Sequence, residues 1–137
     1  MVKNYTFLLL ILFVFACNKE EEIDKSLDTK LIGTWSNGFR NYTFNGDNTY
    51  SLVFTDTSDL RLFSLELLYD SIVGEFYTIK GENVLVMETK LARKFDETNE
   101  VVSISSSPEV TDYTISGNTL TLITTTSQIG YIKIDVE

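Results

Sequence analysis

The chain has 137 residues, with 20 acidic and 11 basic side chains, no histidine and one cysteine. Its formal net charge of −9 repels phosphate backbones and no basic stripe offsets it, which excludes nucleic-acid binding. Without histidine, Ser-His and Cys-His nucleophile pairs and the usual zinc ligand sets are also excluded. We therefore expect a non-enzymatic protein with no catalytic residues, no metal site and no cofactor.

The chain begins with one basic residue, Lys3, followed by an apolar run over residues 7–16 that contains no charge. A helix that spans a bilayer needs roughly twenty apolar residues, so this run is too short for one. A basic start, a short apolar stretch and a cleavage point are typical of a secretory signal peptide. Residues 1–16 are therefore predicted to be a signal peptide that is removed.

The apolar run ends in Val14-Phe15-Ala16-Cys17, and Cys17 is the only cysteine of the chain. This ending resembles the lipobox of bacterial lipoproteins, although Phe15 is bulkier than the residue usual there. The resemblance implies a thioether-linked diacylglycerol on Cys17, cleavage before it, and an outer-membrane lipid as the partner of the acylated cysteine. More than one acyl chain gives firm anchoring without a membrane-spanning helix. The alternative is a secreted protein with one stray thiol.

Asn18 and one lysine follow the cysteine, and three glutamates come directly after them. Lys19, Glu20, Glu21 and Glu22 resemble the lipoprotein export signal of Bacteroidota-type bacteria, which implies transfer to the cell surface. The alternative is a plain solvated acidic segment. Residues 17–30 are predicted to be the lipidated cysteine and a flexible acidic tether, and residues 31–137 a single barrel domain.

A short pattern, Y-T-[FI]-x-G, occurs three times, starting at Tyr42, Tyr77 and Tyr113. Each copy is followed by a second stretch with apolar residues at every other position. Period-two alternation indicates strands, and the glycine suits a tight turn between them. The repeat therefore predicts three hairpins, and abundant aromatic and β-branched residues support an all-β protein.

Further strands are predicted on either side of the hairpins, over residues 31–36 and 128–136. Residues 90–104 form either two short strands or one long strand with a loop. Residues 60–69 are ambiguous between a strand, which the alternation favours, and a short capped helix. Together these elements predict an antiparallel up-and-down β-barrel of about eight strands, because closure leaves no exposed edge.

Gly33 and Trp35 open the first strand, and Phe44 to Tyr50 forms an F-x-x-[DN]-x-T-Y-like segment. With the repeated hairpin, these motifs resemble the lipocalin-like domains of bacterial lipoproteins over most of residues 31–136. The resemblance implies that Gly33 and Trp35 close one end of the barrel. In that family an arginine of the last strand often covers the tryptophan, and here Lys133 is the cation on that strand. The alternative is that Trp35 is a core residue of another β fold.

An eight-stranded barrel is just wide enough either to be filled by side chains or to hold one small ligand. Tyr42, Tyr77 and Tyr113 are predicted near the mouth or the turns. The inward-facing residues, which would line a ligand cavity or pack as a plain core, are predicted to be Phe44, Leu52, Phe54, Ile79, Val84, Val86, Ile115, Leu120 and Leu122.

The leading functional hypothesis is a lipoprotein anchored in the outer membrane, facing the periplasm or the cell surface, whose barrel binds a small apolar or amphipathic ligand. The alternative is a structural or interaction lipoprotein with a filled barrel that contacts another envelope protein. A hydrolase that uses paired carboxylates is a third class, but no particular pair stands out among the twenty acids.

Overall fold

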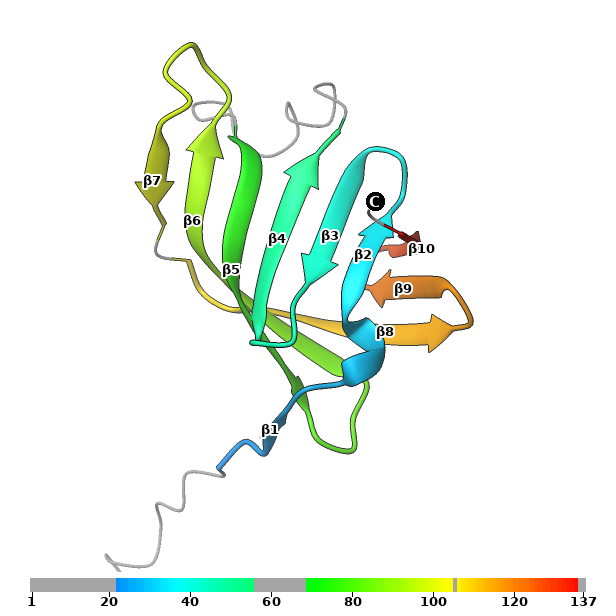
Figure 1. The fold of residues 1–137 in the computed structure, drawn as a ribbon. Helices are drawn as coiled ribbons and strands as arrows, with labels where there is room; N and C mark the ends of the chain where they lie inside the picture. Colours follow the sequence, from blue (N-terminus) through cyan, green and yellow to red (C-terminus); the bar gives the residue numbers. More distant parts are fainter. Residues whose placement is uncertain (1–21, 56–68, 105, 136–137) are drawn as a thin grey trace, which may run out of the picture.

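The computed structural model describes residues 22–55, 69–104 and 106–135. Its elements are β1 (Lys25–Ser26), a 3₁₀ helix η1 (Thr29–Leu31), β2 (Gly33–Ser36), β3 (Arg40–Phe44), β4 (Thr49–Phe54), β5 (Tyr69–Ile79), β6 (Val84–Lys94), β7 (Val101–Ser103), β8 (Glu109–Ser116), β9 (Thr119–Ile123) and β10 (Gln128–Ile134) (Figure 1). None of the helices in the described ranges is long and apolar enough to cross a membrane.

Eight strands form a closed ring in which every neighbour is antiparallel. The ring runs β2-β3-β4-β5-β6-β8-β9-β10, and β10 pairs back with β2. The prediction of an all-β, up-and-down barrel of about eight strands is therefore confirmed. In Figure 1, β2 to β7 stand side by side, and β8 and β9 cross below and behind them.

The three predicted hairpins are all present. They are β3–β4, β5–β6 and β8–β9, with the pairs Phe44 with Tyr50, Thr78 with Leu85, and Ser116 with Thr119 next to the turns. The two flanking strands predicted at the ends of the domain are β2 and β10.

Residues 90–104, expected as two short strands or one long strand with a loop, contain the end of the long strand β6 and, after a turn, the short strand β7. Both β7 and β8 pair with the same edge of β6: Leu91–Arg93 pairs with β7, and Val84–Met87 pairs with β8. The ambiguous segment 60–69 lies outside the described residues except for Tyr69, which begins β5.

The barrel has two unlike ends. At one end, η1 and the β3–β4, β5–β6 and β8–β9 turns surround the start of β2, and we call this the closed end (Figure 1). At the other end lie the β2–β3 turn, the β6–β7 turn and the connection that leads into β8, and we call this the mouth.

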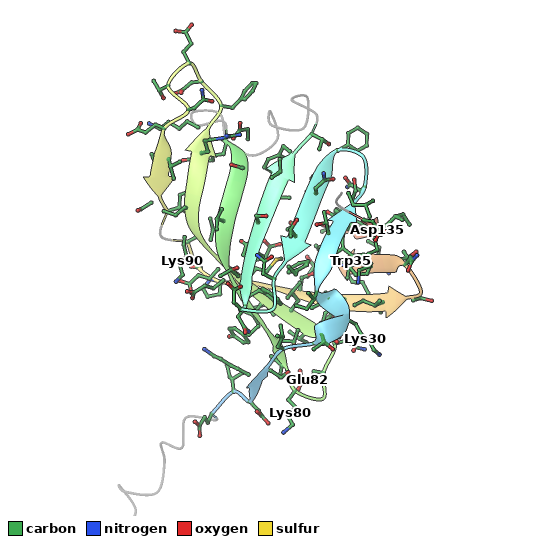
Figure 2. The ribbon with its side chains drawn as sticks, viewed as in Figure 1. Lys30, Trp35, Lys80, Glu82, Lys90 and Asp135 are labelled. Atoms are coloured by element: carbon green, nitrogen blue, oxygen red, sulfur yellow. The ribbon has the colours of Figure 1, made fainter. Side chains whose placement is uncertain are left out.

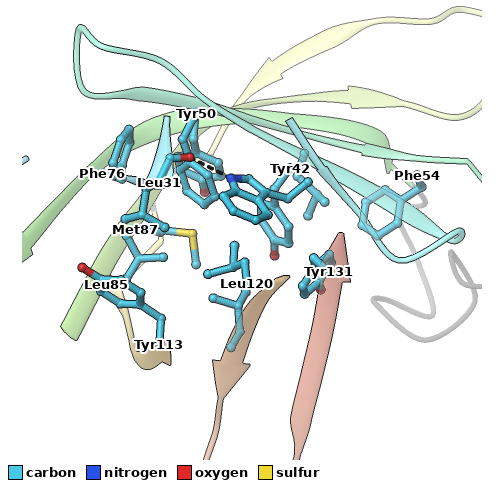
Figure 3. Packing of buried hydrophobic residues seen from close by; sticks show 14 residues of the cluster. Leu31, Tyr42, Tyr50, Phe54, Phe76, Leu85, Met87, Tyr113, Leu120 and Tyr131 are labelled. Atoms are coloured by element: carbon cyan, nitrogen blue, oxygen red, sulfur yellow. Dashed lines mark hydrogen bonds between the residues drawn. The ribbon is translucent and has the colours of Figure 1, made fainter. Parts of the chain in front are cut away.

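A buried aromatic and aliphatic cluster packs inside the barrel (Figure 3). Tyr42 stacks on Phe44 with ring centroids 5.8 Å apart, and Phe44 meets Phe76 edge to face at 4.9 Å. Tyr131 approaches Tyr42 edge to face at 5.4 Å. Offset and edge-to-face geometries of this kind add to the free energy gained from burying the rings.

The segment that precedes the barrel makes hydrogen bonds to it. Ser26 in β1 pairs with Thr78, and the Lys80 amide donates a hydrogen bond to the Asp24 carbonyl at 3.0 Å. The Tyr113 hydroxyl donates to the Asp28 carboxylate at 2.8 Å. The last part of the predicted tether, residues 24–30, is therefore held against the closed end, which corrects the expectation that it is flexible to Lys30.

Candidate functional site: the barrel mouth

The closed end is built around Trp35, which is 1% exposed. Its indole Nε1–H donates a 2.7 Å hydrogen bond to the carbonyl of Leu31, the last residue of η1, and Leu31 is itself fully buried. Since the indole has one donor and that donor is satisfied, the large ring is buried without a polar cost. Figure 3 shows this bond as a dashed line among the core side chains.

A cation covers the tryptophan ring from the last strand. Lys133 pairs in register with Trp35, and its Nζ lies 5.2 Å from the ring centroid. Gly33 makes room for this lysine, because a Cβ at Gly33 would lie 2.8 Å from the Lys133 Cε. A cation therefore covers the tryptophan, as the lipocalin-like resemblance implies, but the cation is a lysine and not an arginine.

A cavity of about 290 Å³ lies inside the barrel on the mouth side of the core. Its walls come from the inner faces of β3 to β6 and from the connection into β8, namely Arg40, Tyr42, Tyr50, Leu52, Ile72, Met87, Thr89, Ser106, Ser107 and Glu109. This volume is at the lower limit of small-molecule pockets, which begin at roughly 300 Å³. The cavity therefore suits one small ligand.

The cavity has both apolar and polar walls. Leu52, Ile72 and Met87 supply the apolar side, while Tyr50 and Thr89 share a hydrogen bond of 3.1 Å between their hydroxyl oxygens. Apolar walls that fill the pocket and a few placed polar groups that orient the ligand are the usual composition of a small-molecule site.

Charges of both signs stand at the rim. Arg40, at the start of β3, has its guanidinium carbon 6.0 Å from the Phe54 ring centroid, and Glu109 begins β8. Burial raises the pKa of the Tyr42 hydroxyl, and Tyr131 and Glu109 raise this pKa further while Arg40 lowers it. The Tyr42 hydroxyl therefore stays protonated near neutral pH.

The predicted lining residues are distributed over three places. Of the nine, Leu52 lines the mouth cavity. Phe44, Phe54, Leu120 and Leu122 belong to the buried core, and Ile115 packs against it. Ile79, Val84 and Val86 lie outside the core cluster, because Leu85 and Met87 occupy the inner face of β6 and alternate with Val84 and Val86.

The tyrosines of the three repeats also take different places. Tyr42 lines the cavity, while Tyr113 lies at the closed end against Asp28. Tyr77 faces outward beneath Lys25, whose Nζ is 4.5 Å from its ring centroid. Lys19, Glu20, Glu21 and Cys17 lie outside the described residues, and Glu22 is exposed at their border.

Sequence reasoning missed most of the residues that form the mouth cavity. Arg40 and Glu109 begin their strands, and Ser106 and Ser107 lie in a loop, so none of them shows an apolar period. Ile72 lies next to a segment whose type was ambiguous from the sequence. Met87 lies in an all-apolar run, so alternation could not place it on the inner face. Tyr50, by contrast, alternates with Leu52 and Phe54 in a predicted strand and was within reach of the alternation argument.

Other hollows in the described part of the chain are less suited to hold a ligand. One, of about 430 Å³, is an open depression on the outside of the barrel between β1, the β3–β4 turn and β5. Another, of about 320 Å³, lies on the outer surface along β8 and the end of β9. The mouth cavity is smaller but lies within the ring of strands, where a ligand would lose most of its contact with water.

The mouth cavity does not assemble a carboxylate pair. Glu109 is the one acidic side chain among the described residues that line it. Glycoside hydrolysis requires two facing carboxyl groups, so the cavity as described lacks that machinery. No group of three or more acidic or cysteine side chains within the described ranges is placed to hold a metal ion.

Comparison of the chain with protein families, with curated proteins and with solved structures found no match. The geometry of the barrel and its cavity therefore carries the functional argument.

Proposed function

We propose that this protein is a lipid-anchored, outer-membrane lipoprotein of the lipocalin-like kind, whose barrel binds one small amphipathic ligand. The observation that carries the binding part is the mouth cavity of about 290 Å³, which lies inside a closed eight-stranded ring. The anchoring part is supported by the lipobox-like ending at Cys17, and surface exposure by the charge pattern from Lys19 to Glu22. The protein is proposed to act as a binder and not as an enzyme.

The ligand is proposed to have an apolar body and a charged or strongly polar head. Its body would rest on Leu52, Ile72 and Met87, and its head would reach the rim. There Arg40 and Glu109 offer charges of either sign, and Tyr42 offers a hydroxyl. A purely apolar ligand would displace water from the polar part of the cavity without replacing the hydrogen bonds of that water, which costs free energy.

The test is binding of short-chain alkyl carboxylates and alkylamines to the purified protein, measured by titration calorimetry and by native mass spectrometry for retained ligand. In the variant Ile72→Trp a large ring replaces a half-buried wall residue, and we expect at least tenfold weaker binding, about 1.4 kcal/mol.

The matched control is Val53→Trp, because Val53 alternates with the wall residue Leu52 and its side chain is 42% exposed on the outer face of β4. Val53→Trp should bind as the unaltered protein does. Equal affinities in the two variants would contradict binding in the mouth cavity, and failure of every probe to bind would count against the binding function.

A second candidate function, contact with another envelope protein, is favoured by one feature of the outer surface. Val53, Val73, Leu91 and Val101 form an exposed apolar stripe across β4 to β7, each 40–59% exposed. At the end of this stripe, β7 pairs only with β6 among the described strands. Apolar side chains beside an open strand edge are typical of protein contacts.

This second candidate is tested by co-purification from envelope extracts. Val101→Lys would place a charge in the stripe and should remove a stoichiometric partner, while Val110→Lys, at a 65% exposed position on β8, should retain it. Absence of any stoichiometric partner for the unaltered protein would reject this function.

A further inference from the structure

The site of membrane attachment and the cavity lie at opposite ends of the barrel. The chain that leads from Cys17 meets the barrel at Asp24, whose carbonyl accepts a hydrogen bond from the amide of Lys80 in the β5–β6 turn. The side chains of the same two residues form an ion pair, in which the Lys80 Nζ lies 3.4 Å from the Asp24 carboxylate. The attachment is therefore at the closed end, where Lys80 and Glu82 also lie in Figure 2.

Further contacts hold this segment in place after Asp24. Thr78 and Ser26 exchange hydrogen bonds, including one of 3.1 Å from the Thr78 hydroxyl to the Ser26 carbonyl. Asp28 accepts from Tyr113, and Leu31 is fully buried beneath Trp35. Because of these contacts, the part of the chain that is free to extend ends at Asp24. Residues 25–31 could lengthen it only if their contacts with the closed end were broken.

The mouth lies a full strand length from that point. β5 runs from Tyr69 on the mouth side to Ile79 next to the tether, and ten residue steps span about 33 Å. With the strand tilt of roughly 40° usual in barrels, the two ends are separated by about 25 Å along the barrel axis.

Covalent geometry limits how far the acylated cysteine can be from the barrel. Seven residue steps separate Cys17 from Asp24, and even a fully extended chain of that length spans at most about 25 Å. To bring the mouth to the bilayer, the tether would have to run fully stretched along the whole barrel. With the closed end toward the bilayer, no stretching is needed.

We propose that acylation of Cys17 holds the barrel with its closed end toward the membrane and its cavity open to the aqueous phase. This inference rests on the proposed lipid anchor and ligand cavity. It identifies the source of the ligand: a molecule dissolved on the aqueous side reaches the cavity, whereas a lipid of the anchoring bilayer does not pass into it directly. The mouth loops are likewise presented to the aqueous side.

The experiment uses the full-length, acylated protein in vesicles of phosphatidylethanolamine and phosphatidylglycerol that carry a headgroup-attached acceptor dye. A donor dye is placed on Glu82→Cys at the closed end or on Phe39→Cys in the β2–β3 turn at the mouth, where Phe39 is 52% exposed. We expect at least about two-fold lower energy transfer from position 39, because it lies about 25 Å farther from the lipid headgroups.

A tether-lengthened protein is the matched control for this measurement. Insertion of a Gly-Ser segment of about twenty residues between Glu22 and Ile23 removes the length limit and should abolish the difference between the two positions. Transfer from position 39 that equals or exceeds transfer from position 82 in the unaltered protein would overturn the proposed orientation.

The failure of the orientation can be distinguished from the failure of the anchor. Mass spectrometry of the mature protein reports whether Cys17 carries the thioether lipid. A protein without that lipid would overturn the anchor and, with it, the orientation. A lipidated protein with equal transfer at both positions would overturn the orientation alone.

Discussion

At the scale of single residues, Trp35 explains how the closed end is sealed. Its ring is covered by Lys133, its Nε1–H is satisfied by Leu31, and its position in β2 is fixed by pairing with Tyr42 and Lys133. Because Leu31 ends η1, the single hydrogen bond at its carbonyl joins the chain before the barrel to the core. Trp35 thus couples the tether to the stability of the barrel.

Replacement of Trp35 by phenylalanine should destabilise the protein by about 2–4 kcal/mol, since it removes buried ring volume, strands the Leu31 carbonyl and loses the lysine contact. Urea unfolding monitored by circular dichroism measures the change. Phe95→Leu, at a position that is 47% exposed, is the control and should change stability by less than about 0.5 kcal/mol. A change of similar size in both variants would show that Trp35 has no special role at the closed end.

At the scale of elements, β5 and β6 show where the pairing of strands decides the inner face. The register between them shifts after Val73, since Val73 pairs with Leu91 and Gly74 pairs with Thr89. Lys90 is thereby left without an opposite residue, which is the pattern of a β-bulge. The strands bend there, and this places Thr89 of β6 beside Tyr50 of β4 at the wall of the cavity.

Gly74 is required at this bend because nothing larger fits. A Cβ at Gly74 would lie 2.1 Å from the backbone oxygen of Glu88 and 2.7 Å from the Tyr50 ring. Gly74→Ala should therefore cost about 3 kcal/mol or more in the free energy of unfolding and displace Tyr50 from the cavity wall. Thermal unfolding gives the first quantity and ligand titration reports the second.

Gly130 in β10 is the matched control, since no atom lies within 4 Å of the Cβ it would carry and its φ is not positive. Gly130→Ala should be neutral or stabilising by up to about 1 kcal/mol, because alanine loses less backbone entropy on folding. If the two alanine variants had the same stability, the close approach at the bend would not be a constraint on the sequence.

At the scale of the whole molecule, buried tyrosine hydroxyls make the barrel sensitive to alkali. Burial raises the pKa of Tyr42 above its usual value of about 10, and burial together with the Asp28 hydrogen bond raises that of Tyr113. A raised pKa in the folded state means that the stabilisation is complete below pH 10. Above pH 10 the unfolded chain releases its phenolic protons first, so stability falls as pH rises.

We expect each tyrosine that stays protonated in the folded state to lower stability by up to about 1.4 kcal/mol per pH unit above pH 10. Urea unfolding at pH 9, 10 and 11 measures the slope, and tyrosinate absorbance follows the ionisation. In Tyr42→Phe the free energy of unfolding should fall less steeply with pH, because the contribution of one tyrosine is removed. An unchanged slope would mean that Tyr42 ionises equally in the folded and unfolded protein.

The sequence alone was sufficient for the class and order of the barrel strands. The three Tyr-Thr hairpins carry period-two alternation and turn glycines, so each pairs locally with itself, and a meander of local pairs closes as a barrel. The Gly33-x-Trp35 start likewise pointed to Trp35, which is buried and covered by Lys133. Local chemistry carries this information because the turn type and the neighbouring strand are set within a few residues.

The tertiary structure alone decided which faces point inward and where the cavity lies. Val84, Leu85, Val86 and Met87 are all apolar, so alternation cannot choose between the two faces of β6, and pairing with β5 and β8 selects Leu85 and Met87. The cavity is formed by side chains from five separate segments, from Arg40 to Glu109. Its position depends on ring closure and on the bend at Gly74, which are long-range properties that no local pattern encodes.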